Sequence, residues 1–410
     1  MERVILHSDL NNFYASVECV LNPDLKNEYI AVCGNEEDRH GIVLAKNQKA
    51  KSCGVKTAET IRSAKQKCPQ LVIVSPHFDE YVKYSNIVRQ IYMQYTDMIE
   101  PFGIDECWLD VTGSQRLFGN GVTIAEKIRN EVKQKTGLTV SIGVSFNKVF
   151  AKLGSDLKKP DAVTEITSTD FKEKIWHLPA NSIIGIGNST YGKLTGYGIR
   201  TIGDLARTPV DFLKRKFGKM GTELWNYANG LDASEVTNCA QIHIPKSISK
   251  GYTLTSDLIS NDEVWRIIFY LCSSIEISLR SYSLKANTVS VTAKNSDLMK
   301  KTFQTHLDCA ENKAYEIAKK AFKIFKSQYT WERNVRSVTV CVSNLCGNDG
   351  NVQMNFFSDN AENQKREKAA EAAYEINKKY GKNSVTYASL LCDMKLPKNA
   401  ETKFMNKGIK

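Results

Sequence analysis

Features that would place this chain outside the ordinary globular class are missing from its sequence. No apolar run approaches the roughly 18 residues that a membrane-spanning helix needs. Near the N-terminus, Asp9 and Glu18 interrupt any apolar region, so we expect no signal peptide. The 11 cysteines include no Cys-x-x-Cys pair. A zinc site or a disulfide framework is therefore not indicated, and reduced thiols in a cytoplasmic protein fit better.

The composition and the distribution of charge narrow the class further. The chain has 410 residues, of which 42% are hydrophobic and 25% charged, which excludes a wholly disordered or collagen-like protein and suggests roughly two to four domains. The net charge is 0 over residues 1–167, +2 over 168–240, +6 over 241–346 and +3 over 347–410. This asymmetry favours a catalytic site within residues 1–167 and polyanion-binding surfaces in the later residues, although mild basicity alone is weak evidence.

Strand-like and helical patterns alternate along the chain and predict an α+β multidomain protein. In residues 1–167, strands at 4–6 and 104–111 combine with helices at 79–98 and 123–136. Residues 24–77 contain shorter elements and look like an insertion. Short helices with glycine breaks follow, and 242–346 predicts a small α+β domain with strands at 288–293 and 335–342 and helices at 263–281 and 309–326.

Three carboxylates occur where predicted strands begin or end. Asp9 follows the first strand, and Asp105 and Glu106 open another. Carboxylates that converge at one edge of a sheet suit Mg²⁺, and two such ions could assist phosphoryl transfer. Asp9 could instead cap the next helix, and Asp105 with Glu106 could form an exposed turn. Neighbouring strand residues face opposite ways, so both of these carboxylates converge only if the strand starts in a turn.

The residues around these carboxylates carry a resemblance. His-Ser-Asp9-Leu-Asn-Asn-Phe-Tyr14 comes first, followed by Gly-Ile-Asp105-Glu106-Cys-Trp-Leu-Asp110 and then Asn147-Lys148-x-x-Ala-Lys152-x-x-Ser155-x-x-x-Lys159-Pro160. In this order the three motifs resemble the Y-family translesion DNA polymerases, most closely the bacterial DNA polymerase IV group. The resemblance covers residues 1 to about 345, and Gly103 departs from it where the family often has Ser.

The resemblance implies a right-hand polymerase fold with a definite division of the chain. Residues 1–23 and 78–167 would form the palm, 24–77 the fingers, 168–235 a helical thumb with a helix-hairpin-helix, and 243–345 a separate α+β little finger. Residues 346–410 would carry a clamp-binding motif, a helix and a flexible tail. The implied activity is DNA-directed DNA synthesis of low fidelity that tolerates damaged templates.

The resemblance also implies the roles of individual residues in the active site. Asp9, Asp105 and Glu106 would be catalytic and would bind two Mg²⁺ ions with the backbone carbonyl of Leu10. Residues of the nucleotide pocket would be Phe13, Tyr14, Gln48, Lys51 and Lys159, with Tyr14 as the steric gate against ribose. Phe13 and Tyr14 could also be core aromatics, and Phe13 suits that role better. Where the family usually has Tyr and Arg, this chain has Gln48 and Lys51.

Further contacts are expected with DNA and with a partner protein. Gly185 and Gly187 resemble a helix-hairpin-helix that binds phosphates, although a Gly-x-Gly can be a plain turn. Lys246, Lys250, Arg333 and Arg336 would bind primer-template DNA, whereas lysines 313–326 read as a solvated face. The motif Gln353, Met354, Phe356 and Phe357 resembles the peptide by which bacterial polymerases dock on the sliding clamp, with an edge strand as the alternative.

Two other functions compete with that of a polymerase using deoxyribonucleoside triphosphates. A non-catalytic DNA-binding scaffold recruited by the clamp would have lost its carboxylates, and all three are present. Another palm-domain enzyme, such as a nucleotide cyclase, would not need the hairpin or the basic third domain. We expect a cytoplasmic monomer.

Overall fold

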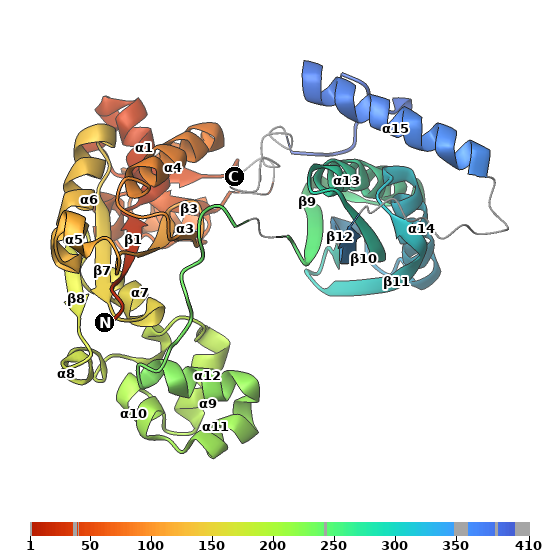
Figure 1. Ribbon diagram of the computed structural model, residues 1–410. Helices are drawn as coiled ribbons and strands as arrows, with labels where there is room; N and C mark the ends of the chain where they lie inside the picture. The colour runs from red at the N-terminus through yellow and green to blue at the C-terminus, as the bar shows by residue number, and fades with distance from the viewer. Residues whose placement is uncertain are drawn as a thin grey trace. The chain divides into compact units, whose positions relative to one another are not determined.

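The computed structural model divides the chain into two compact units, and its described residues are 2–35, 39, 41–241, 244–347, 360–381 and 384–397. One unit comprises residues 1–34 and 42–242, and the other residues 35–41 and 243–410 (Figure 1). All 11 cysteines are free thiols. Within the described ranges, the helices are too short or too polar to cross a membrane. The predicted domain boundaries remain predictions.

A five-stranded sheet is the centre of the first unit, in the order β5-β6-β1-β7-β8. Its strands are β1 (Ile5–Leu10), β5 (Ile99–Pro101), β6 (Glu106–Asp110), β7 (Val140–Ser145) and β8 (Val163–Ile166). Strand β1 runs antiparallel to both β6 and β7. Every residue of β1 and β7 is buried, in keeping with strands that are covered on both faces.

Helices cover both faces of this sheet. Helices α1 (Phe13–Leu21), α4 (Phe78–Tyr92) and α6 (Gly121–Thr136) share a core with Leu6, Leu10 and Val144. Helix α7 (Lys148–Leu157) covers the other face. It lies so close that a Cβ atom on Gly143 of β7 would meet the carbonyl oxygen of Ala151 at 1.8 Å. Side chains of α7 therefore lie directly against the sheet.

The predicted fingers segment contains a small sheet of its own, in the order β3-β2-β4. It consists of β2 (Ile30–Cys33), β3 (Val43–Lys46) and β4 (Val72–Val74), with the short helices η1 (Pro23–Asn27), α2 (Gln48–Ser52) and α3 (Ile61–Lys67). Helix α1 joins it to the larger sheet, because Ala15 packs against Ile30 and Val32. Helix α5 (Gln115–Phe118) precedes α6.

A group of short helices follows β8: α8 (Phe171–Ile175), η2 (Ala180–Ser182), α9 (Asn188–Gly196), α10 (Ile202–Arg207), α11 (Val210–Phe217) and α12 (Lys219–Ala228) (Figure 1). Their core includes Val149, Phe150 and Leu153 of α7. Helix α7 is thus packed against the five-stranded sheet on one side and against the helical group on the other.

The second unit is built on a four-stranded antiparallel sheet in the order β11-β10-β12-β9. Its strands are β9 (Ser247–Leu258), β10 (Leu284–Asn295), β11 (Lys300–Glu311) and β12 (Val335–Gly347). Helices α13 (Asn261–Ser281) and α14 (Ala314–Gln328) share its core. Burial alternates along β10, so one face of the sheet is packed and the other is open. The prediction of a helix at 309–326 was wrong at its start, because Cys309 belongs to β11.

The C-terminal part of the described chain returns to this second unit. Helix α15 (Asn360–Tyr380) is followed by η3 (Ala388–Leu390), and Leu390 is buried in the core formed with α13. The amide of Thr255 donates to the carbonyl of Lys395 at 2.9 Å. The Lys395 ammonium also pairs with Glu263 at 2.7 Å. Residues 384–397 therefore pack against β9 and α13, an association that the sequence pattern did not indicate.

Candidate active site

The three predicted carboxylates come together at the β1–β6 pair. Antiparallel register places Asp9 of β1 opposite Glu106 of β6, so the two side chains share a face of the sheet. Asp105 lies in the bend before β6, and its carbonyl accepts a hydrogen bond from the Leu10 amide at 3.0 Å. The alternative that Asp9 caps a helix is wrong, since Asp9 lies within β1 and Asn12 is the N-cap of α1.

Two lysines that follow in the chain neutralise part of this charge. Lys152 of α7 donates to both carboxylate oxygens of Glu106, at 2.9 and 2.8 Å. Lys159 donates to Asp9 at 2.8 Å and also pairs with Asp156 at 2.8 Å. Although burial opposes it, the attraction of Asp9 raises the pKa of Lys159. The sequence motif contained Lys152, but its contact with Glu106 was not predicted.

The carboxylates remain short of positive charge despite these lysines. Burial raises the pKa of Asp9 to about 6; Lys159 opposes this rise, and the neighbouring Glu106 adds to it. Burial and the charge of Asp9 also raise the pKa of Asp105. Each raised pKa means that the ionised carboxylate is energetically unfavourable at its position in the fold. Additional positive charge beside Asp9 and Asp105 would therefore be favourable.

The donor set fits a hard divalent cation, because carboxylate and carbonyl oxygens are the ligands that Mg²⁺ prefers. Within the ranges that the structure describes, no group of three His, Cys, Asp or Glu side chains is already arranged as a metal site. Lys152 is bonded to both oxygens of Glu106 and Lys159 to one oxygen of Asp9, so an ion at these carboxylates would compete with the lysine contacts.

A buried histidine, which sequence reasoning missed, lies beside the carboxylates. The ring Nδ1 of His7 is 2.9 Å from the hydroxyl of Ser155, which donates to the carbonyl of Lys152 at 2.7 Å. The His7 Nδ1 must therefore be the donor to Ser155. Burial, with the charges of Lys152 and Lys159, lowers the pKa of His7 well below its usual value. His7 is thus a neutral support for α7 on the sheet.

Tyr14 lies at the edge of the same site, on α1. Its ring stacks on Tyr81 of α4 with centroids 4.2 Å apart and planes at 10°, and Phe78 meets it edge-on at 5.9 Å. Burial and the nearby Asp105 raise the pKa of Tyr14. The preceding Phe13 is 3% exposed and belongs to the core. This agrees with the expectation that Phe13 suits a core role better than Tyr14 does. Tyr14 therefore has a fixed ring close to the carboxylates.

The loop that carries Lys159 is held in place from two sides. Asp161 pairs with Arg129 at 2.9 Å and with Lys133 at 2.8 Å, both on α6. The Asp161 amide also donates to the side-chain oxygen of Asn11 at 2.8 Å. These bonds fix the chain on both sides of the sheet edge, so Lys159 is kept beside Asp9.

The fingers residues named from the sequence are on the outside of α2. Gln48 and Lys51 are both exposed and lie three residues apart, so they share one side of the helix. Lys46, at the end of β3, was not predicted. Burial and the charge of Lys51 lower the pKa of Lys46, which places these two cations near each other. A lysine two residues before the helix was the sequence signal that could have found it.

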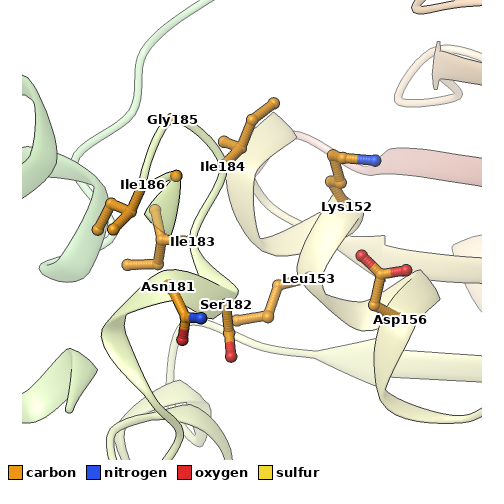
Figure 2. Close-up of a pocket in the computed structure, with 10 residues that line it drawn as sticks. Lys152, Leu153, Asp156, Asn181, Ser182, Ile183, Ile184, Gly185 and Ile186 are labelled. Carbon is orange, nitrogen blue, oxygen red and sulfur yellow. The ribbon is translucent and has the colours of Figure 1, made fainter. Parts of the chain in front are cut away.

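The predicted hairpin glycines lie opposite α7. Gly185 has φ +90° and Gly187 is the N-cap of α9. With Lys152 and Asp156 of α7 they line a pocket of about 450 Å³, whose walls Figure 2 shows. Gly221 of α12 is required by packing, since a Cβ there would meet the carbonyl oxygen of Leu213 at 2.2 Å. The pocket lies on the side of α7 that faces the helical group.

The basic residues of the second unit differ in their surroundings. Lys246 is exposed, Arg336 is half-buried, and Arg333 pairs with Asp297 at 2.8 Å. Lys250 shares the strand parity of buried Ile248 and Tyr252, so it lies on the packed side of the sheet. The open face carries mainly hydroxyl and small residues, namely Ser249, Gly251, Thr253, Ser290, Thr292, Thr339 and Ser343, together with Lys294 and Lys300, which are opposite each other in the β10–β11 register. The predicted clamp residues Gln353, Met354, Phe356 and Phe357 lie outside the described residues.

Comparisons with known proteins agree with this arrangement. The model of the impB/mucB/samB family matches residues 8–156, and the model of its C-terminal domain matches residues 245–356. The model of the DNA polymerase-iota thumb domain matches residues 181–232. The chain is 49% identical to DNA polymerase IV of Acetivibrio thermocellus over 394 residues, which covers 96% of this chain and 98% of the relative. It is 35% identical to DNA polymerase IV of Pelotomaculum thermopropionicum, over 94% of each chain.

A solved structure extends the likeness to the fold. A Y-family DNA polymerase chimera aligns with a TM-score of 0.74 and 27% identity, over 84% of this chain and 100% of that chain. Together with the palm, thumb and little-finger matches, this confirms the expected right-hand polymerase fold. The chain belongs to the Y family of DNA polymerases, in the DNA polymerase IV group, and is a DNA-directed DNA polymerase of the translesion type.

Proposed function

We propose that Asp9, Asp105 and Glu106 form the catalytic centre and hold two Mg²⁺ ions, with the carbonyl of Leu10 as a further ligand. The observation that carries this proposal is the register of β1 and β6, which sets Asp9 opposite Glu106 with Asp105 at the strand start. Bound there, the ions would stabilise charge on the attacking and leaving oxygens of phosphoryl transfer. Glu106 would be the carboxylate most closely linked to activating the primer 3′-hydroxyl.

The reaction is attack of the primer 3′-oxygen on the α-phosphorus of a deoxyribonucleoside triphosphate, with pyrophosphate as the leaving group. Lys159 would give up its contacts with Asp9 and Asp156 and place its ammonium on the triphosphate. Gln48 and Lys51 of α2 would contact the same phosphates, and Lys46 adds a cation beside Lys51. Ammonium groups at these positions suit a ligand that arrives with its own negative charge.

Tyr14 would be the steric gate that excludes ribonucleotides. Its stacking on Tyr81 and its edge contact with Phe78 keep the ring from rotating away from a bulkier sugar. A ribose 2′-hydroxyl would then clash with a ring that cannot move aside, so ribonucleotides would be excluded by steric repulsion. Phe13 would pack behind Tyr14 from the core, which is consistent with its burial.

Primer-template DNA would be held by two surfaces. The amides around Gly185 and Gly187 would bind backbone phosphates at the start of α9. In the little finger, Lys246, Arg333 and Arg336 would bind the DNA backbone, whereas Lys250 lies on the packed side of the sheet. The hydroxyl side chains of the open sheet face add donors for phosphate oxygens there. Neither surface would read base sequence, which suits a polymerase that accepts many templates.

Primer extension with single variants tests the catalytic assignment. We expect Glu106→Gln and Asp105→Asn to lose extension by about a thousandfold or more, since they remove groups required in the transition state. Asp110→Asn is the matched control, because Asp110 ends the same strand and accepts from the amide of Thr112 at 2.9 Å. Abasic and undamaged templates should be affected alike. Full-rate synthesis by Glu106→Gln would disprove the assignment.

The proposals on partners and location rest on the sequence. We propose that Gln353, Met354, Phe356 and Phe357 dock on the sliding clamp, and that the protein acts as a monomer in the cytoplasm. Two adjacent Phe residues in a polar stretch support the clamp contact, because they suit a preformed apolar pocket. A pull-down should lose the clamp when Phe356→Ala and Phe357→Ala are combined. Retention of clamp binding by this variant would remove the proposal.

A further inference from the structure

We propose that Lys152 is a built-in counter-ion of Glu106, which the divalent ion must displace, so that Lys152 sets the ion concentration at which the site loads. This inference rests on the proposed metal-binding role of Asp9, Asp105 and Glu106. It assigns to Lys152 a positioning role: Lys152 acts through Glu106 and through the ion.

The geometry of the pair shows how completely Lys152 occupies Glu106. The ammonium is bonded to both carboxylate oxygens, at 2.9 and 2.8 Å. The two side chains are only 16% and 19% exposed, so water screens the pair less than it would at the surface. An ion approaching Glu106 therefore has to replace a contact that uses the same two oxygens.

The structure also contains an alternative position for the Lys152 ammonium, beside Asp156. Lys152 lines the pocket of about 450 Å³ between α7 and the hairpin, and Asp156, one turn along the helix, lines it too (Figure 2). Asp156 is bound to Lys159 at 2.8 Å in this state. If Lys159 moves to a triphosphate, Asp156 becomes available to Lys152. Release of Glu106 and arrival of the nucleotide would then favour each other.

A neighbouring lysine on the same helix provides a matched control. Lys148 lies one turn before Lys152, is 12% exposed and pairs with Glu100 at 2.7 Å. It also lies over an aromatic ring, Trp108 at 4.6 Å, as Lys152 lies over Phe102 at 5.2 Å. The two lysines differ in one respect that matters here, namely that Glu100 is not among the carboxylates assigned to the ions.

The test is calorimetric titration of Mn²⁺ into the full-length protein without DNA. Lys152→Met should bind Mn²⁺ about five- to tenfold more tightly, since no cation then has to leave. Lys152→Arg should bind Mn²⁺ several-fold more weakly, because a guanidinium can form two parallel hydrogen bonds with the Glu106 carboxylate. Lys148→Met should match the wild type. The arginine variant keeps the charge and carries the test if the methionine variant does not fold.

Thermal unfolding supplies a second readout. In chelator, Lys152→Met should unfold at a lower temperature than wild type, and Mn²⁺ should restore most of the loss, whereas the loss in Lys148→Met should persist with Mn²⁺. Equal Mn²⁺ affinity in the Lys152 and Lys148 variants overturns the inference. If Asp105→Asn leaves wild-type Mn²⁺ binding unchanged, the metal-site proposal itself fails, and the inference falls with it.

Discussion

The palm sheet, which is antiparallel except for the parallel β7–β8 pair, and the antiparallel little-finger sheet expose their faces differently. Helices cover both faces of the palm sheet, and β1 and β7 are buried along their whole length. The little-finger sheet is packed on one side only, and β10 alternates between buried and half-exposed residues. The palm can therefore offer polar groups only at strand ends and from α7, whereas the little finger offers a whole face.

This difference in exposure goes with a difference in how charge is handled. In the palm, the carboxylates proposed as catalytic are largely buried, and Asp9 and Glu106 are each bonded to a lysine. In the little finger, the open face is lined mainly with hydroxyl groups, which need no counter-charge, and it also carries Lys294 and Lys300. A buried site must keep its charges paired until a substrate or an ion replaces the partner. An open face can wait for a polyanion without such pairing.

The largest effect is expected where the palm is most tightly packed. A Cβ on Gly143 would lie 1.8 Å from the carbonyl oxygen of Ala151 and 2.5 Å from the amide of Ser155, both backbone atoms of α7. Backbone cannot turn aside, so Gly143→Ala should push α7 from the sheet and cost about 3 kcal/mol or more. Because α7 carries Lys152, extension should fall as well. Urea unfolding measures the free energy.

Gly113→Ala is the control for this prediction, since a Cβ there meets nothing within 4 Å. It should change stability by less than about 0.5 kcal/mol. If Gly143→Ala is as stable as this control, α7 does not lie on the sheet as described, and the contrast between the two sheets is lost.

Next in size is the selectivity expected from Tyr14. Tyr14→Val removes the stacked ring and should raise ribonucleotide incorporation relative to deoxyribonucleotide about a hundredfold, or about 2.7 kcal/mol. Single-nucleotide insertion with matched ribo and deoxy substrates measures this ratio. Phe78→Leu removes an aromatic neighbour of Tyr14 but leaves the ring, so it should change the ratio much less. An unchanged ratio in Tyr14→Val would exclude the gate.

The contrast between the sheets also explains what could be predicted from sequence. Strongly buried strands such as β1 and β7 have an apolar signature, and the turn before Glu106 was required by strand geometry. The edge strand β11 was missed, because polar residues outnumber apolar ones in it and only one side is packed. The bonds of Lys152 to Glu106 depend on the packing of α7 on the sheet, which no local pattern encodes.

A smaller effect is expected for the equivalent close contact in the little finger. Gly251 of β9 is opposite Thr339 of β12, and a Cβ on Gly251 would lie 2.2 Å from the Thr339 hydroxyl. That hydroxyl can rotate away, but the Thr339 Cβ, which the added methyl would meet at 2.8 Å, cannot, so Gly251→Ala should cost about 2 kcal/mol. Adding Thr339→Ala should recover part of the loss in a double-mutant cycle. Strictly additive losses would show that the two residues do not compete for space.

The smallest effect is expected at helix α2. Like the open sheet face, this helix is exposed, and its proposed phosphate contacts do not depend on a buried charge pair. Gln48 and Lys51 replace the Tyr and Arg usual in the family, and Lys lacks the bidentate fork of Arg. Gln48→Tyr combined with Lys51→Arg should therefore hold the triphosphate more firmly and lower KM for nucleotide a few-fold. Steady-state kinetics measures this, with Lys49→Arg on the same helix as control. Lys49 donates to the carbonyl of Asn27 at 2.6 Å and so is already engaged away from the nucleotide. An unchanged or raised KM in the double variant would mean that α2 does not limit how tightly the triphosphate is held.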